Sequence, residues 1–308
     1  HLKLNIFAVS NSRKLVLSKE GINSDWKKEI ENSNQPATIK DVIAFTKANH
    51  LENLIAIDNT ASKDFVANYT TLVENGFDLV SSNKIANTLD FKFYKELRSL
   101  LDKNQKQYLY ETNVGAGLPL IDTIRILHLS GENITRIRGV FSGTLSYLFN
   151  QFSSEEKTFN EILKDTIDKG FTEPDPREDL NGNDVGRKLL ILARELDLKN
   201  EFEDVNIQNL VPDGLRDKEV PEFLQSLEAF NAPYQEIKDN QEEGNVLRYV
   251  GDLHGDLQQD KGILDVKLVS VPADSVLGQV KGADSIFEIY TESYGDRPIV
   301  IQGAGAGA

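Results

Sequence analysis

Cysteine is absent from the 308 residues of this chain, and so is methionine. Without cysteine, a disulfide framework, a thiolate metal site and a thiol nucleophile are all excluded. The hydrophobic runs are short, since no stretch of 18 or more apolar residues could form a membrane-spanning helix, and the first residues lack the pattern of a signal peptide. These absences predict a cytoplasmic protein that does not enter a membrane.

A basic surface is missing as well. Asp and Glu number 49 against 34 Lys and Arg, which gives a formal net charge of −15. Binding to nucleic acid through an extended surface needs clustered Lys and Arg to neutralise phosphates, so nucleic acid is not an expected partner. Hydrophobic residues make up 39% and charged residues 27%, an ordinary globular composition, and the length suits two domains. Small molecules are therefore the expected partners.

The glycine-rich turn of dinucleotide-binding folds is also lacking. No G-x-G-x-x-G precedes the first strand-like run, LNIFAVS. That turn normally follows the first strand and brings the pyrophosphate to a helix N-terminus. If the first domain binds a dinucleotide, we expect its first strand, glycine turn and helix to precede His1. The missing methionine and the ending GAGAGA likewise suggest a fragment.

Residues 1–112 alternate strand-like and helix-like segments. The strand-like runs are LNIFAVS, NLIAID, FDLVSS and QYLYET, and amphipathic stretches such as TIKDVIAFTKANH separate them. Strict alternation predicts an α/β fold, a Rossmann-type doubly wound parallel sheet with helices on both faces. Ligands of such sheets bind beyond the carboxyl ends of the strands. A cofactor is therefore expected at the loops AVSNSRK, IDNTASK and VSSNKIANT.

From residue 113 the pattern changes. The helix-like stretches LPLIDTIRILHLSG, GTLSYLFNQF, TFNEILKDTIDKG and DVGRKLLILAREL come first, and the strand-like runs NVLRYVGDL, GILDVKLVSV, SIFEIYTES and PIVIQ follow. Helices segregated from later strands predict an α+β domain with a mixed or antiparallel sheet over residues 113–302.

The most specific segment is GFTEPDPREDLNGNDVGRKLLILARE, residues 170–195. Its two prolines predict an extended TEPDP segment, because proline fixes its own φ and keeps the preceding residue out of the helical region. This stiff loop carries Glu173 and Asp175. Asn181 or Asn183 is then expected to cap the next helix.

Within that helix, Asp184 and Lys188 are four residues apart and share one face, at the edge of an apolar stripe that includes Val185 and Leu189. A half-buried lysine beside a carboxylate can hand a proton to a substrate oxygen. A surface ion pair, worth a few tenths of a kcal/mol, explains the same spacing. It does not explain the stiff acidic loop immediately before it.

Two small-residue turns have both a structural and a functional interpretation. In YETNVGAGLPL, residues 110–120, the bare backbone could coordinate a cation or face an anion, and it could equally be a tight turn between domains. In FSGTLSYLF, Ser142, Gly143 and Thr144 stand at a helix start. They predict an ordinary N-cap that could also touch a ligand.

Polar residues follow the predicted strands of the first domain. Lys84 follows one strand and is either solvated or functional, and Thr60 with Ala61 follows another. Ser12 and Arg13 follow LNIFAVS, where an arginine would meet the 2′-phosphate of NADP. The histidines are scattered without ligand spacing, so we predict no zinc site.

Seven segments together resemble the homoserine dehydrogenase family. They are DNTAS, SSNKIANT, YETNVGAGLPLIDTIR, GVFSGTLSYLFNQF, GFTEPDPREDLNGNDVGRKLLILARE, VLRYVGDL and PIVIQGAGAGA, which occur in family order over most of the chain. TEPDPREDLNGND followed by RK is the most specific of them. NKIANT and LRYVGDL look closest to the dehydrogenase half of bifunctional aspartokinase–homoserine dehydrogenases, in which a kinase precedes this part.

The resemblance implies reversible reduction of L-aspartate 4-semialdehyde to L-homoserine with NADH or NADPH, on the route to threonine, isoleucine and methionine. Lys188 matches the proton donor of the family, and Lys84 matches the lysine between nicotinamide and substrate. The residues expected to bind the substrate are Glu173, Asp179, Asp184 and Thr144.

The resemblance also assigns the cofactor and ion contacts. Residues 303–308 are expected to return to the cofactor domain, and the second domain is expected to form a homodimer or higher homo-oligomer. The expected cofactor-binding residues are Thr60, Ala61, Lys84, Gly170, Gly307, Ser12 and Arg13. A Na⁺ or K⁺ site is expected, mostly from backbone oxygens, at Glu111, Val114, Ala116 and Leu118.

Two positions depart from the family pattern. Ile85 replaces a second lysine, which leaves NAD or NADP open, and Asn183 stands where an apolar residue is usual. Because the glycine turn is missing, a catalytically silent module of the same fold that binds an amino acid for regulation is the alternative. A purely structural dimerisation domain is poorly motivated, since the acids and the lysine of the signature are all present.

Overall fold

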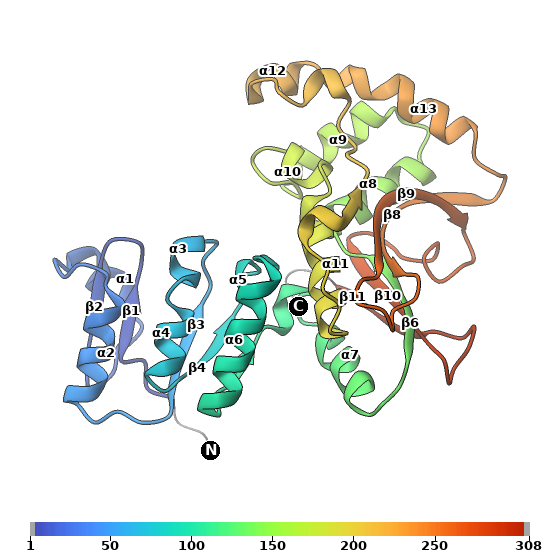
Figure 1. The fold of residues 1–308 in the computed structure, drawn as a ribbon. Coiled ribbons are helices and arrows are strands. Elements are labelled where there is room, and N and C mark those ends of the chain that lie inside the picture. Colours follow the sequence, from blue (N-terminus) through green and yellow to red (C-terminus); the bar gives the residue numbers. More distant parts are fainter. Residues whose placement is uncertain (1–3, 305–308) are drawn as a thin grey trace. The chain divides into compact units, whose positions relative to one another are not determined.

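The computed structural model describes residues 4–304, and this part of the chain divides into two compact units (Figure 1). Unit 1 comprises residues 4–85 and 95–109. Unit 2 comprises residues 86–94 and 110–304. The chain therefore passes from one unit to the other more than once, and α5 (Ile85–Thr88) and α6 (Phe91–Asn104) contribute residues to both.

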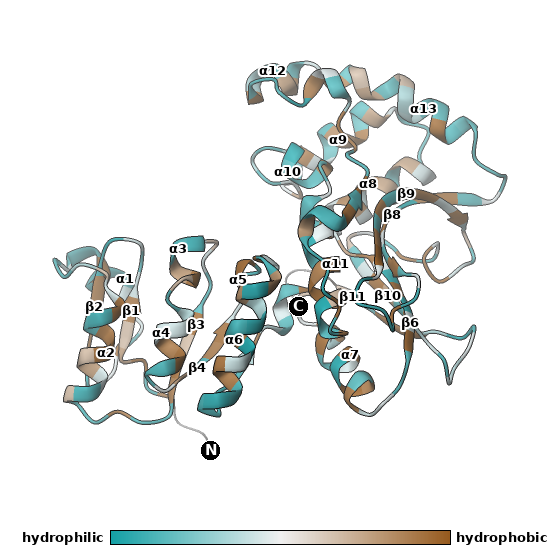
Figure 2. Ribbon diagram, in the orientation of Figure 1, coloured by the Kyte–Doolittle hydropathy of each residue, from teal (hydrophilic) through white to brown (hydrophobic). Residues whose placement is uncertain are grey.

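Unit 1 contains a parallel sheet in the order β3-β4-β5. These strands are Leu54–Asp58, Phe77–Ser81 and Tyr108–Leu109. The helices that precede or connect them are α1 (Trp26–Asn32), α2 (Ile39–Ala48), α3 (Lys63–Val66) and α4 (Tyr69–Glu74). Figure 2 shows hydrophobic and hydrophilic residues side by side on α2, α4 and α6, as expected for helices with one buried face. The predicted α/β class is confirmed.

One strand assignment in unit 1 is wrong. Within the described residues, LNIFAVS contributes the short strand β1 (Ala8–Ser10), which pairs antiparallel with β2 (Leu15–Leu17) and not with the parallel sheet. The side chain of Asn11 accepts the N–H groups of Arg13 and Lys14, both at 2.8 Å. Such an Asx turn reverses the chain at once, and the hairpin satisfies the backbone groups of the strand locally.

Unit 2 is built on a mixed sheet in the order β11-β10-β6-β8-β9-β7, in which only the β7–β9 pair is parallel among the described strands. The strands are β6 (Ile134–Val140), β7 (Val205–Ile207), β8 (Asn245–His254), β9 (Ile263–Pro272), β10 (Asp284–Thr291) and β11 (Ile299–Ala304). The predicted mixed sheet is confirmed.

Strand β6 was not predicted from the sequence, although it lies inside the sheet. Its segment ITRIRGV carries two arginines that pair across to neighbouring strands. Arg136 contacts Asp252 on β8 at 2.5 and 2.8 Å, and Arg138 contacts Glu288 on β10 at 2.5 Å. Charged residues inside a sheet are tolerated when they are paired in this way, but the pairing is invisible in the local pattern.

The longer helices of unit 2 are α7 (Leu120–Leu129), α8 (Gly143–Ser154), α9 (Phe159–Asp168), α11 (Asn183–Glu195) and α13 (Asn231–Asp239). Shorter helical elements are η1 (Glu111–Asn113), α10 (Arg177–Leu180), η2 (Phe202–Asp204), η3 (Asp213–Leu215), α12 (Val220–Gln225) and η4 (Leu227–Phe230). Helices α8 and α11 pack against β8 of the sheet. In the part of the chain that the structure describes, no helix is long and apolar enough to cross a bilayer.

Helix α11 begins in an unexpected way. Its N-cap is Gly182, with φ +76°, and neither of the predicted asparagines. Asn181 instead accepts the N–H of Asn183 at 2.8 Å. A Cβ at position 182 would lie 2.1 Å from the hydroxyl oxygen of Tyr249 on β8 and 2.9 Å from Ile207 on β7. Glycine is therefore required both by the left-handed backbone and by the close approach of the sheet.

We expect Gly182→Ala to lower the free energy of unfolding by about 2–5 kcal/mol, from left-handed strain of about 1–2 kcal/mol and overpacking of about 1–3 kcal/mol. Gly131→Ala is the matched control, because Gly131 also has a positive φ, +84°, but nothing lies within 4 Å of its added Cβ. The control should show the strain alone. Urea unfolding of both variants measures the difference, and equal losses would contradict the predicted clash.

Candidate functional site

The acidic loop of unit 2 begins where α9 ends. Gly170 has φ +72° and turns the chain out of the helix. Pro176 then lies in the helical region, with φ −60° and ψ −15°, and starts α10. The prediction that TEPDP is extended throughout is therefore wrong at Pro176, because proline at a helix start is already preorganised for the helix.

An arginine anchors the loop from outside. The guanidinium of Arg177 contacts both carboxylate oxygens of Asp175 at 2.7 to 3.1 Å and also donates to the carbonyls of Arg216, at 3.0 Å, and Lys218. It also lies 5.1 Å over the ring of Phe223. Asp175 is thus engaged by its own neighbour and holds the loop.

Asp179 is the centre of an acidic cluster that also contains Glu173 and Asp184. Its carboxylate accepts the backbone N–H of Glu173 at 2.8 Å. Burial raises the pKa of Asp179, and the nearby charges of Glu173 and Asp184 raise it further, against hydrogen bonds from the Glu173 N–H and the Thr144 hydroxyl. The structure therefore brings together four residues predicted to bind substrate, Thr144, Glu173, Asp179 and Asp184.

Thr144 stands at the start of α8, where Ser142 is the N-cap, as expected. Its hydroxyl donates to the carbonyl oxygen of Phe171 at 2.6 Å and lies within reach of Asp179. A hydroxyl has a single proton, so Thr144 serves one of these acceptors at a time. It therefore links α8 either to the acidic loop at Phe171 or to α10 at Asp179.

Lys188 is held at two points. Its Nζ lies 2.7 Å from a carboxylate oxygen of Asp184 and donates to the carbonyl oxygen of Phe141 at 2.9 Å. The Lys188 side chain is 17% exposed and that of Asp184 is 44% exposed. The i,i+4 ion pair therefore exists, but its lysine is largely buried and is oriented by a carbonyl as well.

Two charged residues fix the other end of α11. Arg194 is fully buried and donates to the carbonyls of Asn87, at 2.8 Å, and Leu89, at 2.7 Å, and to the carboxylate of Glu201 at 2.9 Å. Glu195 accepts the hydroxyl of Tyr110. Neither residue was assigned a role from the sequence, although a charged pair at the end of the apolar run LLILARE was the available signal.

The predicted cation loop runs from Glu111, the first residue of η1, to Leu118, which precedes α7. The carboxylate of Glu111 accepts the N–H groups of Ile121, at 2.8 Å, and Asp122, at 3.0 Å, and so caps α7. Burial raises the pKa of Glu111, against these two hydrogen bonds. Ala116 has φ +52°, and Val114 is fully buried.

The other predicted member of that site, Leu118, donates its N–H to the Gly115 carbonyl at 3.0 Å. Across residues 4–304, no group of three or more His, Cys, Asp or Glu side chains is placed to hold a metal ion. A cation site built from neutral backbone oxygens is a different class, so it stays a prediction.

The predicted cofactor loops of unit 1 meet at a buried carboxylate. Asp58, at the end of β3, accepts the hydroxyl of Tyr69 at 2.7 Å, the side-chain amide of Asn83 at 3.0 Å and the backbone N–H of Thr60 at 2.8 Å. Asn83 follows β4 and also donates to the carbonyl of Ser62 at 3.2 Å. The loops after β3 and β4 are therefore fixed side by side, as expected for the carboxyl edge of a parallel sheet.

The remaining predicted cofactor residues are placed as follows. Thr60 and Ala61 are exposed beside the Asp58 network, and Lys84 is half-buried between β4 and α5. Ser12 and Arg13 are exposed in the β1–β2 turn. Gly170 is exposed in unit 2, and Gly307 lies outside the described residues.

Two family models match the sequence. One is described as homoserine dehydrogenase and matches residues 119–308, and the other is described as the NAD binding domain of homoserine dehydrogenase and matches residues 1–111. A bifunctional aspartokinase/homoserine dehydrogenase of Haemophilus influenzae is 36% identical over 310 residues, which are 100% of this chain and 37% of that protein. The chain thus spans little more than a third of that curated relative.

A relative of more similar length is a homoserine dehydrogenase of Paracoccidioides brasiliensis, 36% identical over 302 residues, which are 92% of this chain and 80% of that protein. Among solved structures, a Candida auris protein of unknown function superposes with a TM-score of 0.88 at 31% identity, and the match covers 99% of this chain and 87% of that chain.

The raised pKa of Asp179 predicts a pH dependence of stability. The native carboxyl binds its proton more tightly than the unfolded one, whose pKa is near 3.8, so its contribution to stability is fully present below 3.8 and is lost as pH rises through the native value. Relative to Asp179→Asn, the unaltered protein should therefore lose stability as pH rises from 3.8. Urea unfolding between pH 3.5 and 7 measures this.

Asp175 supplies the control of opposite sign. The Arg177 guanidinium lowers the pKa of Asp175, so the stability that it contributes is present above its unfolded pKa and is lost on acidification. Relative to Asp175→Asn, the unaltered protein should gain stability as pH rises. Two differences of the same sign would contradict the assignment of the two carboxylates.

Proposed function

Because the chain belongs to the homoserine dehydrogenase family, we propose that its protein catalyses the reversible, NAD(P)H-dependent reduction of L-aspartate 4-semialdehyde to L-homoserine, a step toward threonine, isoleucine and methionine. The observation that carries the proposal is the largely buried Lys188, fixed by Asp184 and Phe141 beside the acidic cluster. The cluster suits an ammonium group, and the lysine suits a neighbouring oxygen.

Lys188 acts as the proton donor in the direction of reduction. An ammonium group carries three N–H donors, and the described residues supply partners for two of them, Asp184 and Phe141. The third is available to the carbonyl oxygen of the substrate, which becomes a hydroxyl when it receives the proton. In the reverse direction, the same nitrogen takes the proton back from the hydroxyl.

The acids bind the substrate and do not act as bases. Glu173, Asp179 and Asp184 bring several negative charges close together, and this repulsion helps to raise the pKa of Asp179. A substrate ammonium group between them would relieve the repulsion, because an opposite charge favours the ionised carboxylates. Thr144 is proposed to orient the substrate from the start of α8.

Unit 1 holds the cofactor, which supplies or accepts the hydride when bound. The loops that follow its parallel strands β3 and β4 fit such a ligand. The Asp58 network fixes the backbone of these loops and leaves Thr60 and Ala61 exposed. The proposed cofactor-binding residues are Thr60, Ala61, Lys84, Ser12, Arg13, Gly170 and Gly307. Lys84 is in addition proposed to act between nicotinamide and substrate. Arg13 would favour NADP by meeting its 2′-phosphate.

The loop from Glu111 to Leu118 is proposed to bind Na⁺ or K⁺ through backbone oxygens of Glu111, Val114, Ala116 and Leu118. Consecutive left-handed residues support this proposal, since Gly115, with φ +78°, and Ala116, with φ +52°, curl the backbone tightly. The strained, non-glycine Ala116 indicates that the surrounding structure holds this turn in place.

Two assembly proposals accompany the activity. We propose a fused aspartokinase domain, because seven similar curated proteins are bifunctional aspartokinase/homoserine dehydrogenases. We also propose a homodimer or higher homo-oligomer formed through unit 2.

We expect Lys188→Met to lower kcat for homoserine oxidation by roughly 10²–10⁴-fold, the usual contribution of a positioned proton donor. The KM for homoserine should change little, since the acids remain. Steady-state kinetics of the full-length protein, followed by nicotinamide absorbance, measure both quantities.

Lys218→Met is the matched control, because Lys218 forms an i,i+4 ion pair with Glu222 on α12. Its kinetics should be unchanged. Full activity of Lys188→Met would exclude the lysine as proton donor. Homoserine binding without nicotinamide binding or turnover in the full-length protein would support the silent regulatory module instead.

A further inference from the structure

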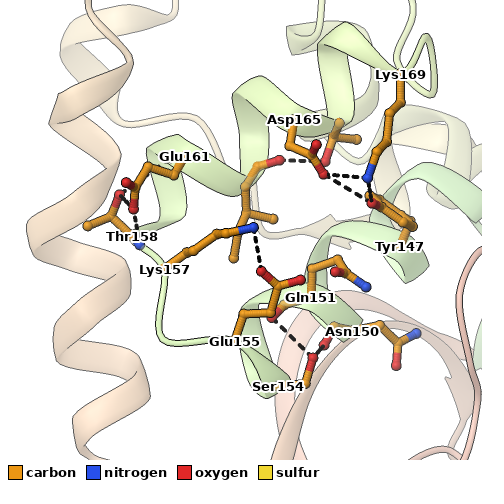
Figure 3. A network of polar contacts seen from close by, with 12 residues as sticks. Tyr147, Asn150, Gln151, Ser154, Glu155, Lys157, Thr158, Glu161, Asp165 and Lys169 are labelled. Atoms are coloured by element: carbon orange, nitrogen blue, oxygen red, sulfur yellow. Dashed lines mark hydrogen bonds and ion pairs between the residues drawn. The ribbon is translucent and has the colours of Figure 1, made fainter.

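Tyr147, Asp165 and Lys169 form a latch between α8 and α9 (Figure 3). The ammonium group of Lys169 donates to the hydroxyl oxygen of Tyr147 at 2.6 Å and to the carboxylate of Asp165 at 2.8 Å, and the Tyr147 hydroxyl donates to the same carboxylate at 3.1 Å. These two partners raise the pKa of Lys169, so it stays charged at neutral pH.

The latch directly precedes the acidic loop. Lys169 is the C-cap of α9, and Gly170 and Phe171 follow it. The ring of Phe171 lies against the ring of Tyr147, with centroids 4.8 Å apart, and its carbonyl accepts the Thr144 hydroxyl at 2.6 Å. Thr144 and Tyr147 are three residues apart and share a face of α8. One helix face therefore holds the chain at positions 169 and 171.

Two residues further on is Glu173, whose N–H is bound by Asp179 at 2.8 Å. The backbone between Phe171 and Glu173 is so short that a shift of Phe171 would also move Glu173. We propose that Tyr147 is a positioning residue, which acts through Lys169 and Phe171 to place Glu173 and Asp179 around the ammonium group of the substrate. This inference rests on the proposed function and assigns the latch a part in it.

Stability alone gives a weak reason for the latch. The side chains of Lys169 and Asp165 are 49% and 40% exposed, and exposed ion pairs contribute only about 0–1 kcal/mol. The aromatic cores of α8 and α9, with Phe149 and Phe152 packed against Phe159, already join the two helices. Loss of the latch should leave the fold intact and free the start of the loop.

The test compares Tyr147→Phe, Tyr147→Leu and Lys169→Met in the full-length protein. Tyr147→Phe keeps the ring on Phe171 and removes only the hydroxyl, whereas Tyr147→Leu removes both. We expect the KM and the calorimetric Kd for L-homoserine to rise about tenfold for Tyr147→Phe and Lys169→Met, equivalent to about 1.4 kcal/mol. The rise should be larger for Tyr147→Leu. In all three variants kcat and the nucleotide KM should change less than threefold. Lys169→Arg should restore the homoserine binding that is lost in Lys169→Met.

Lys157→Met is the control, because Lys157 pairs with Glu155 at 2.6 Å in the segment that connects α8 to α9 (Figure 3). Its homoserine KM should be unaltered. The proposal is overturned if Tyr147→Phe and Lys169→Met bind homoserine as Lys157→Met does, or if thermal stability and kcat fall while both KM values rise together.

The unaltered protein separates this inference from the proposed function. If it oxidises homoserine, the KM values decide the role of the latch. If it binds homoserine but does not turn it over, the proposed activity fails, and the Kd values still decide the role of the latch. If it does neither, both proposals fail.

Discussion

A polar group that leaves water must find hydrogen-bond partners inside the protein, and this requirement fixes the functional loops of both units. In unit 1 the buried carboxylate of Asp58 gathers Thr60, Tyr69 and Asn83, so the loops after two parallel strands have one geometry. In unit 2 the half-buried Asp179 accepts the backbone N–H of Glu173 and has the hydroxyl of Thr144 within reach. The polar side chains are thus part of the frame that holds the site.

Helix α11 applies the same constraint to Lys188. At its start the helix approaches the sheet so closely that only Gly182 fits beneath Tyr249. At its end the buried guanidinium of Arg194 donates to two carbonyls and to Glu201. Fixed at both ends, the helix cannot rotate to expose Lys188. The ammonium group therefore meets Asp184 and the Phe141 carbonyl at the apolar edge, a less mobile position than a surface ion pair would give.

The sequence predicted what depends on local pattern and missed what depends on distant partners. The α/β class of unit 1, helices α7, α8, α9 and α11, and strands β8 to β11 followed from periodicity. Strand β6 was missed because Arg136 and Arg138 look like surface residues in the local sequence. Their partners, Asp252 and Glu288, are distant in the sequence. The N-cap of α11 was misassigned because the glycine at position 182 is required by the close approach of Tyr249, which lies on a later strand. The acids of the candidate site were predicted from motif and spacing, but the hold of Thr144 on Phe171 joins segments that no local pattern connects.

The acidic cluster explains why so many of the surrounding contacts hold the acidic loop in place. Glu173, Asp179 and Asp184 repel one another, and without a ligand the loop would relax by moving its charges apart. The contacts that oppose this movement lie outside the cluster. On one side, Arg177 binds Asp175 and the carbonyl of Arg216. On the other side, the Tyr147 latch and Thr144 hold the chain before Glu173. Arg177 and Lys169 pair with Asp175 and Asp165, which lie outside the cluster, whereas Lys188 pairs with Asp184 within it. These two anchors therefore leave the repulsion between Glu173 and Asp179 in place, and its relief on binding favours a ligand that carries an ammonium group.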